Sequence, residues 1–493
     1  MVGPLIRRTV IESDQNKLDP TENPIDFQKL LENQQSGINW VKRFEGGLRF
    51  FLPNCFKREK TGEIVCISEI LPPFEESHLA NKLVDKNVKR TAVKTLELYK
   101  SVLNQPLQLK HPDIHSHHFF KQNIDSLESL LPIIPYLETN SYDLNSLSGK
   151  QWKALDVVHF ELTQNKLLLA AQLLNSTSVN EVRELLAKHF NVDFSKALVS
   201  EILAKNLAYT LDQGGKILSI PIKQQNGFYL MIEYTVREFT VGDNLPVYIL
   251  EADQKEVVAP PFMVIRGTET TFNRKGSIES LQMDLLDAEG IAVEPLYKSL
   301  ALDKNEKSIH YFFDKWEKEG KKPIITGHSL GGFLSLWIGV HFLSKIDGVF
   351  TFNSPGVSNS LVQIYREQCK KSDTPNPQDK IVNFVREGDP VSGLESHFIG
   401  QSIETWPSNS TNDKGIQEIH SEYILLGAFN AQKIDCEKEQ ENTHRRRLNM
   451  VRQLASYCLK NSDIFKTTPD WWTQKSEYLV KYQTALREHL GFN

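Results

Sequence analysis

The chain has 493 residues, 24% of them charged and 40% hydrophobic, so it can bury a core and is not expected to be disordered. It carries 57 Lys and Arg against 62 Asp and Glu, and a net charge of −5 argues against a protein that binds nucleic acid through its overall charge. The five cysteines show no C-x-x-C spacing, which predicts neither a zinc site nor a disulfide framework.

The N-terminus lacks the pattern of a secretory signal, because MVGPLIRRTVIESDQ reaches acidic residues before any apolar segment of the required length. The most apolar stretch, residues 333–343, is too short to cross a bilayer and contains Ser335, Gly339 and His341. We therefore expect a soluble protein, cytoplasmic or exported without an N-terminal signal peptide, that does not span a membrane.

The first part of the chain, residues 1–215, has a helical pattern. Apolar residues recur there at steps of three and four, as in Leu198, Ile202 and Leu203, and Gly214-Gly215 is a plausible helix stop. These features predict an all-helical N-terminal domain that ends near residue 215.

From residue 216 the pattern changes to strands. Ile220 and Ile222 alternate with other residues ahead of Asn226-Gly227, a strong hairpin signal. After residue 290 helical patterns alternate with apolar strands at 324–326, 349–353 and 381–385. This alternation predicts an α/β domain over 216–436 with a mostly parallel sheet, followed by a charged helical extension over 437–493.

A G-x-S-x-G motif at Gly327, Ser329 and Gly331 follows one of these strands and precedes an apolar helix. In that context the motif is typical of a nucleophile elbow, whose flanking glycines permit a sharp turn that exposes the serine oxygen. The N–H of Leu330, the next residue, would face a developing oxyanion. On its own the motif is also compatible with a turn that has no chemistry.

An upstream strand, residues 262–265, ends in Arg266-Gly-Thr. A second oxyanion donor must come from a loop beside the nucleophile, and the glycine would permit close backbone approach there. This makes Thr268 the candidate second donor.

Together these segments resemble the class 3 lipases of the α/β-hydrolase fold. The resemblance rests on Ile265-Arg-Gly-Thr, Thr326-Gly-His-Ser-Leu-Gly-Gly, Thr351-Phe-Asn-Ser-Pro-Gly and Val382-Asn-Phe-Val-Arg-Glu-Gly-Asp-Pro-Val, within residues 216–430. It implies Asp389 as the catalytic acid, which the chain order of this fold also favours. It also implies a mobile lid near residues 277–288, although most amphipathic helices of this kind simply pack on the core.

The catalytic base must be chosen among the five histidines after Ser329. His341 lies about 18 Å along the elbow helix and is excluded, whereas His397 and His489 fall in segments unlike the family's base. His420 starts a segment that resembles the family's, so we assign the base to it. His444, beside three arginines that would lower its basicity, remains the alternative.

These residues predict hydrolysis of a carboxylic ester, most simply of a lipid, by Ser329, His420 and Asp389, with no metal or organic cofactor. The alternatives are a phospholipase or acyltransferase that uses the same residues, or a partner-binding scaffold with an inert hydrolase domain. Peripheral contact with a membrane is an open question, and the sequence identifies no protein partner for residues 1–215.

Overall fold

The structure is a computed structural model of the chain. It describes residues 65–67, 92–93, 96–97, 125, 127–133, 147–210, 214–241, 245–252, 259–267, 308–357, 359–371, 376–387, 389, 391–393, 398–407, 420, 423–426 and 429–434. The predicted lid at 277–288 and the C-terminal extension at 437–493 lie outside these residues.

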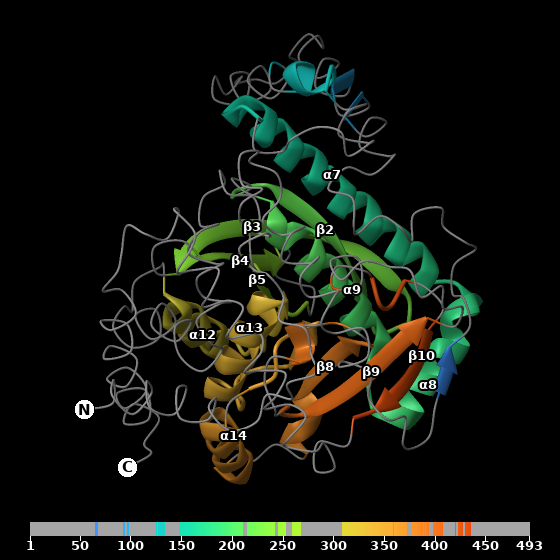
Figure 1. Ribbon diagram of the computed structural model, residues 1–493, viewed down its shortest axis with the longest axis vertical. Helices are drawn as coiled ribbons and strands as arrows, with labels where there is room; N and C mark the ends of the chain where they lie inside the picture. Colours follow the sequence, from blue (N-terminus) through green and yellow to red (C-terminus); the bar gives the residue numbers. More distant parts are fainter. Residues whose placement is uncertain are drawn as a thin grey trace, which may run out of the picture.

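One ten-stranded sheet forms the centre of the described part (Figure 1). Its strand order is β1-β10-β9-β8-β7-β6-β5-β4-β3-β2. The strands are β1 (Val65–Ile67), β2 (Ile217–Lys223), β3 (Tyr229–Val241), β4 (Leu245–Ala252), β5 (Phe262–Ile265), β6 (Ile324–His328), β7 (Gly348–Phe352), β8 (Ile381–Arg386), β9 (Gln401–Pro407) and β10 (Phe429–Lys433).

The sheet is mixed, which corrects the prediction of a mostly parallel one. Strands β5 to β9 pair in parallel, whereas β2 to β5 and β9, β10 and β1 pair antiparallel. Short connections account for β2 to β5, since they favour antiparallel neighbours. The hairpin predicted at Asn226-Gly227 is confirmed: it joins β2 to β3, and Gly227 has a φ of 87°.

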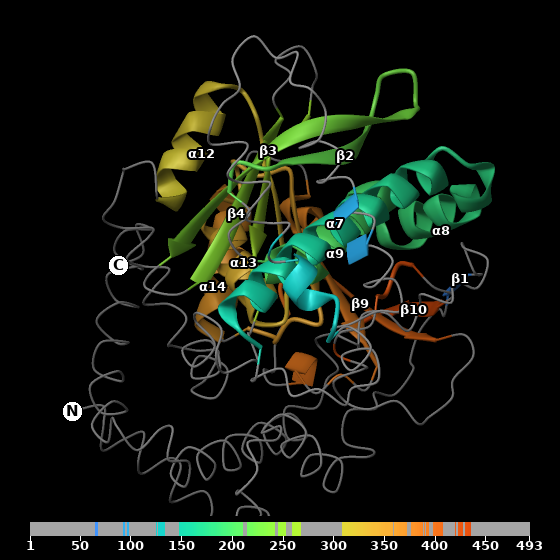
Figure 2. The same cartoon turned by 90° about the horizontal axis from the view of Figure 1, so that it is seen from above.

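Helices cover both faces of the sheet (Figure 2). One face carries α7 (Gly149–Leu174), α8 (Asn180–Phe190) and α9 (Phe194–Lys205), and the other carries α12 (Ile309–Lys318), α13 (Leu330–His341) and α14 (Asn359–Lys371). Strands β5 to β8 occupy successive positions across the sheet in chain order. Right-handed crossovers therefore place the helices that connect them on a single face. The opposite face is left for helices from elsewhere in the chain.

Alternation along the parallel strands supplies a core on each side. On β5, Val264 packs in the cluster that contains α9, whereas Met263 and Ile265 pack in the cluster that contains α12 and α13. Parallel strands are typically buried on both faces, and here every residue of β5, β6, β7 and β8 is buried.

The region before residue 215 therefore shares a hydrophobic core with the strands after it. It is also not all-helical, because β1 pairs with β10 at the sheet edge and buries Val65. The residue-215 boundary coincides with the change from helix to strand, and the division at 215 and 436 into domains stays a prediction. Among the helices that the structure describes, none combines the length and apolar character needed to cross a membrane.

Helix α9 offers a direct test of this shared core. Leu203 on α9 is 0% exposed, so Leu203→Ala should lower the free energy of unfolding of the whole chain by about 2–5 kcal/mol. Leu168→Ala, at a position on α7 that is 48% exposed, should change it by less than about 0.5 kcal/mol. Urea unfolding followed by circular dichroism and by tryptophan fluorescence measures both; a shift in the first signal alone would show that the helices unfold as a separate unit.

Candidate active site

Ser329 occupies a sharp turn between β6 and α13. Its backbone has φ 58° and ψ −133°, a conformation that residues other than glycine rarely adopt. The N–H of Ser329 donates to the carbonyl of Phe352 on β7 at 3.1 Å, and its own carbonyl accepts from Gly332 and Phe333. A strained backbone that the surrounding structure holds in place is a common feature of functional sites.

The two glycines of the motif make this turn possible. A Cβ atom at Gly327 would lie 2.2 Å from the carbonyl oxygen of Gly331, and one at Gly331 would lie 2.2 Å from that of Ile265 on β5. Both positions therefore exclude any side chain. The result is a helix that begins directly against the ends of β5 and β6, with Leu330 as its first residue. The first N–H groups of a helix have no acceptor within the helix and suit a negatively charged oxygen.

Asp389 and His420 form a hydrogen-bonded pair beyond the strand ends. His420 Nδ1 lies 2.7 Å from Asp389 Oδ1, and the carboxylate is fully buried while the imidazole is 18% exposed. The other carboxylate oxygen accepts from the N–H of Ser392 at 2.8 Å and from the Ser392 hydroxyl. An ionised carboxylate only accepts, so Nδ1 carries the proton and Nε2 of His420 is left as a hydrogen-bond acceptor.

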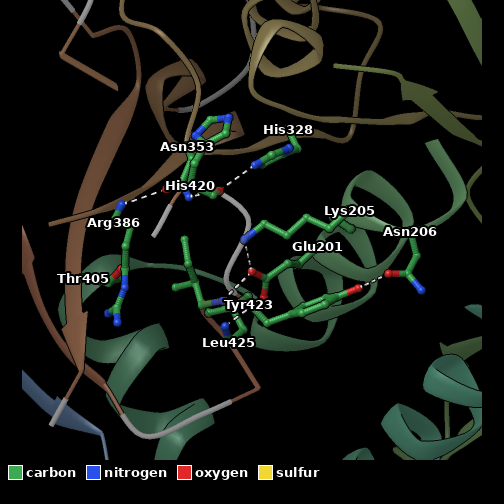
Figure 3. Close-up of polar contacts among 12 residues, drawn as sticks. Glu201, Lys205, Asn206, His328, Asn353, Arg386, Thr405, His420, Tyr423 and Leu425 are labelled. Carbon is green, nitrogen blue, oxygen red and sulfur yellow. Dashed lines mark hydrogen bonds and ion pairs between the residues drawn. The ribbon is translucent and has the colours of Figure 1, made fainter. Parts of the chain in front are cut away.

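The backbone of His420 is also held in place (Figure 3). Its carbonyl accepts from Asn353 Nδ2 at 2.6 Å and from His328 Nε2 at 2.8 Å. Because a carbonyl cannot donate, His328 carries its proton on Nε2, and its Nδ1 then accepts from the Tyr209 hydroxyl at 2.9 Å. The rings of His328 and His420 have centroids 4.6 Å apart, which places His420 beside the residue that precedes Ser329.

His328 is neutral in this arrangement. Burial lowers the pKa of its imidazole well below the ordinary value, and the neighbouring His420 side chain and the Lys205 ammonium lower it further. A neutral imidazole has one donor and one acceptor, and both are used, toward His420 and Tyr209.

Of the residues predicted from the sequence, Ser329 and Leu330 lie at the start of α13, and Asp389 and His420 contact each other. His420 also contacts His328, the residue before Ser329. Thr268 and His444 lie outside the described residues. Gly267, the neighbour of Thr268, does lie at the elbow, because a Cβ atom there would be 3.2 Å from Ser329 Cβ and 2.5 Å from the His328 carbonyl.

Four further residues were missed by reasoning from the sequence: His328, Asn353, Ser392 and Tyr209. His328 and Asn353 lie inside segments already selected for their motifs, and Ser392 directly follows another, so neighbours of the motif residues were the available signal. Tyr209 comes from a helical turn, Leu207–Tyr209, and nothing in its local sequence indicates an active-site contact. Within the described ranges, no cluster of three or more His, Cys, Asp or Glu side chains is arranged to hold a metal ion.

Comparison with known proteins gives weak likenesses only. No family model matches the chain. No curated protein matches it. Similar solved structures include a lipase–propeptide complex from Rhizomucor miehei (15% identity, 39% of this chain and 67% of that one, TM-score 0.25). They also include a lipase from Yarrowia lipolytica (16%, 41% and 73%, 0.27) and a triacylglycerol lipase from Penicillium expansum (12%, 49% and 81%, 0.27).

The neutral state of His328 predicts a pH dependence of stability. Its folded pKa lies below the unfolded value of about 6.5, so the unfolded chain gains the extra proton as the pH falls below that value. The free energy of unfolding should fall with the pH in this window, by at most about 1.4 kcal/mol per pH unit for this group. His328→Gln should reduce the slope of stability against pH, measured by urea unfolding between pH 7.5 and 5. Equal slopes for the two proteins would contradict the assignment.

Proposed function

We propose that the chain is a serine hydrolase of carboxylic esters with an α/β-hydrolase fold. The observation that carries the proposal is the strained Ser329 at a strand-to-helix turn, whose neighbour His328 packs with its ring centroid 4.6 Å from that of His420. The Nδ1 of His420 is in turn bonded to a buried carboxylate. Nucleophile, orienting acid and base then follow in the chain order Ser329, Asp389, His420, which is typical of this fold.

In this mechanism Ser329 Oγ attacks the ester carbonyl carbon while His420 Nε2 accepts the hydroxyl proton. The imidazolium next gives this proton to the departing alcohol, which leaves an acyl group on Ser329. Water then attacks the acyl carbon with the same base, and the acid is released. Asp389 keeps Nδ1 protonated and stabilises the positive charge that His420 carries between these steps.

The negative charge that forms on the carbonyl oxygen requires fixed donors. The N–H of Leu330, at the start of α13, is one candidate, and the N–H of Thr268 is the second. The approach of Gly267 to Ser329 supports the second assignment, since it brings the chain at the end of β5 next to the nucleophile.

A lipid ester is the proposed substrate class. The resemblance of the motif segments to class 3 lipases supports it, and the apolar core of α13 beneath the elbow is compatible with it. Glyceride hydrolysis, phospholipid hydrolysis and acyl transfer all form the same acyl-enzyme. Assays of each lipid class, with and without an added acceptor alcohol, therefore distinguish these three reactions.

Ser329→Ala should fold normally and reduce hydrolysis of a short-chain ester by about a millionfold, as loss of the nucleophile does in a well-studied serine protease. Ser335→Ala is the matched control, because this buried serine lies on the same helix and its hydroxyl only donates to the Gly331 carbonyl. Initial rates of p-nitrophenyl ester hydrolysis measure both. Full activity in Ser329→Ala would exclude the proposed nucleophile.

The same assay decides the base. His420→Ala should lower kcat by several orders of magnitude, since the Asp389-bonded imidazole would be lost. His444→Ala should leave kcat within about twofold of the wild type, because this histidine has no role in the proposed mechanism. The reverse result would transfer the role of base to His444.

A further inference from the structure

A buried ion pair lies on α9, outside the residues assigned to the chemistry. Lys205 Nζ is 2.9 Å from Glu201 Oε1, and the side chains are 3% and 0% exposed, respectively. Burying two charges is costly, and a buried pair is seldom more stabilising than apolar residues of the same size. A gain in stability therefore does not by itself explain why this ion pair is buried here.

The Glu201 carboxylate binds a segment that follows His420 (Figure 3). Its Oε1 accepts from the N–H of Ile424 at 2.5 Å, and its Oε2 accepts from the N–H of Leu425 at 2.8 Å. Hydrogen bonds from backbone N–H groups to an ionised carboxylate are stronger than neutral ones and fix geometry. The carboxylate thus binds two successive residues of a segment that lies more than 200 residues later in the chain.

A second contact between α9 and this segment involves Tyr423. Burial and the nearby Glu201 charge hold the pKa of Tyr423 well above its ordinary value, so the hydroxyl keeps its proton. It donates to Oδ1 of Asn206, the residue that caps α9, at 2.5 Å. The end of α9 therefore contacts three consecutive residues, 423–425.

These contacts bear on His420 through the connecting chain. The His420 carbonyl is fixed by His328 and Asn353, and residue 423 is only three positions further along. The chain is thus held at His420 and again at residues 423–425, and both attachments limit how far the imidazole can move from Asp389. Catalytic groups must be held within about 0.5 Å, and a displacement of about 1 Å can reduce rates a hundredfold.

We propose that Glu201, with Lys205 as its counter-ion, is a positioning residue for His420. This inference rests on the proposed function, in which His420 is the base. The Lys205 ammonium pairs with the Glu201 carboxylate inside the core, and the carboxylate sets the place of the segment that follows His420. In this way α9, which precedes the strands that carry the site, takes part in the site without contacting the reacting atoms.

The test compares Glu201→Gln with Glu251→Gln. Glu251 is a close match, because it accepts from Lys315 Nζ at 2.6 Å and from Trp316 Nε1 at 2.9 Å, and its side chain is only 14% exposed. It differs in place, since its partners lie on α12, which covers the opposite face of the sheet.

Two measurements are made on the full-length chain. Glu201→Gln should lower kcat for a short-chain ester by tenfold to a hundredfold with KM unchanged, whereas Glu251→Gln should keep kcat within twofold. In ¹H NMR of protein labelled with ¹⁵N-histidine, the downfield Nδ1–H resonance of His420 should be lost or shifted in Glu201→Gln. The same resonance should persist in Glu251→Gln.

If Glu201→Gln does not fold, the double variant Glu201→Met with Lys205→Met replaces it, because it removes both buried charges at similar volume and leaves the two N–H groups unbound. The same loss of kcat and of the resonance is expected from it. An unchanged kcat and resonance in the folded variant would overturn the proposal, and so would equal losses in Glu251→Gln. A wild type without esterase activity would instead contradict the proposed function, and the resonance would still decide the role of Glu201.

Discussion

The structure depends on the need to bury both faces of its parallel strands. Strands β5 to β8 follow one another in a single direction, so their own connecting helices, α12 to α14, cover only one face. The other face would expose a continuous apolar surface, and α7 to α9, which precede β2 to β10 in sequence, cover it. These helices are therefore part of the same core as the strands that carry the site.

This requirement also explains how the site is held. The elbow and the Asn353 turn lie at the ends of the adjacent strands β6 and β7. Tyr209 and Glu201 come instead from the helical segments that cover the face of the sheet opposite α12 to α14. Around His420 the two groups meet: His328 and Asn353 bind its carbonyl, and Glu201 binds the chain beyond it. The position of one imidazole thus depends on segments far apart in sequence.

The sequence was informative where a local pattern determines the structure. The hairpin at Asn226-Gly227, the strand at 262–265 and the turn at Ser329 each follow from a few adjacent residues. It was uninformative where pairing is distant: strand β1 has only three residues, and its partner β10 lies more than 360 residues later in the chain. The helical pattern of α9 revealed an apolar face but could not show that Glu201 on it would bind residues 424 and 425, because such a contact leaves no local periodicity.

The claim that Ser329 is an activated nucleophile can be tested most directly by covalent labelling. A fluorophosphonate reacts only with a serine whose proton a neighbouring base removes, and mass spectrometry of the digested protein identifies the modified residue. We predict a single adduct on the peptide that contains Ser329, which disappears in His420→Ala. An adduct on another serine, or none on the folded protein, would contradict the account.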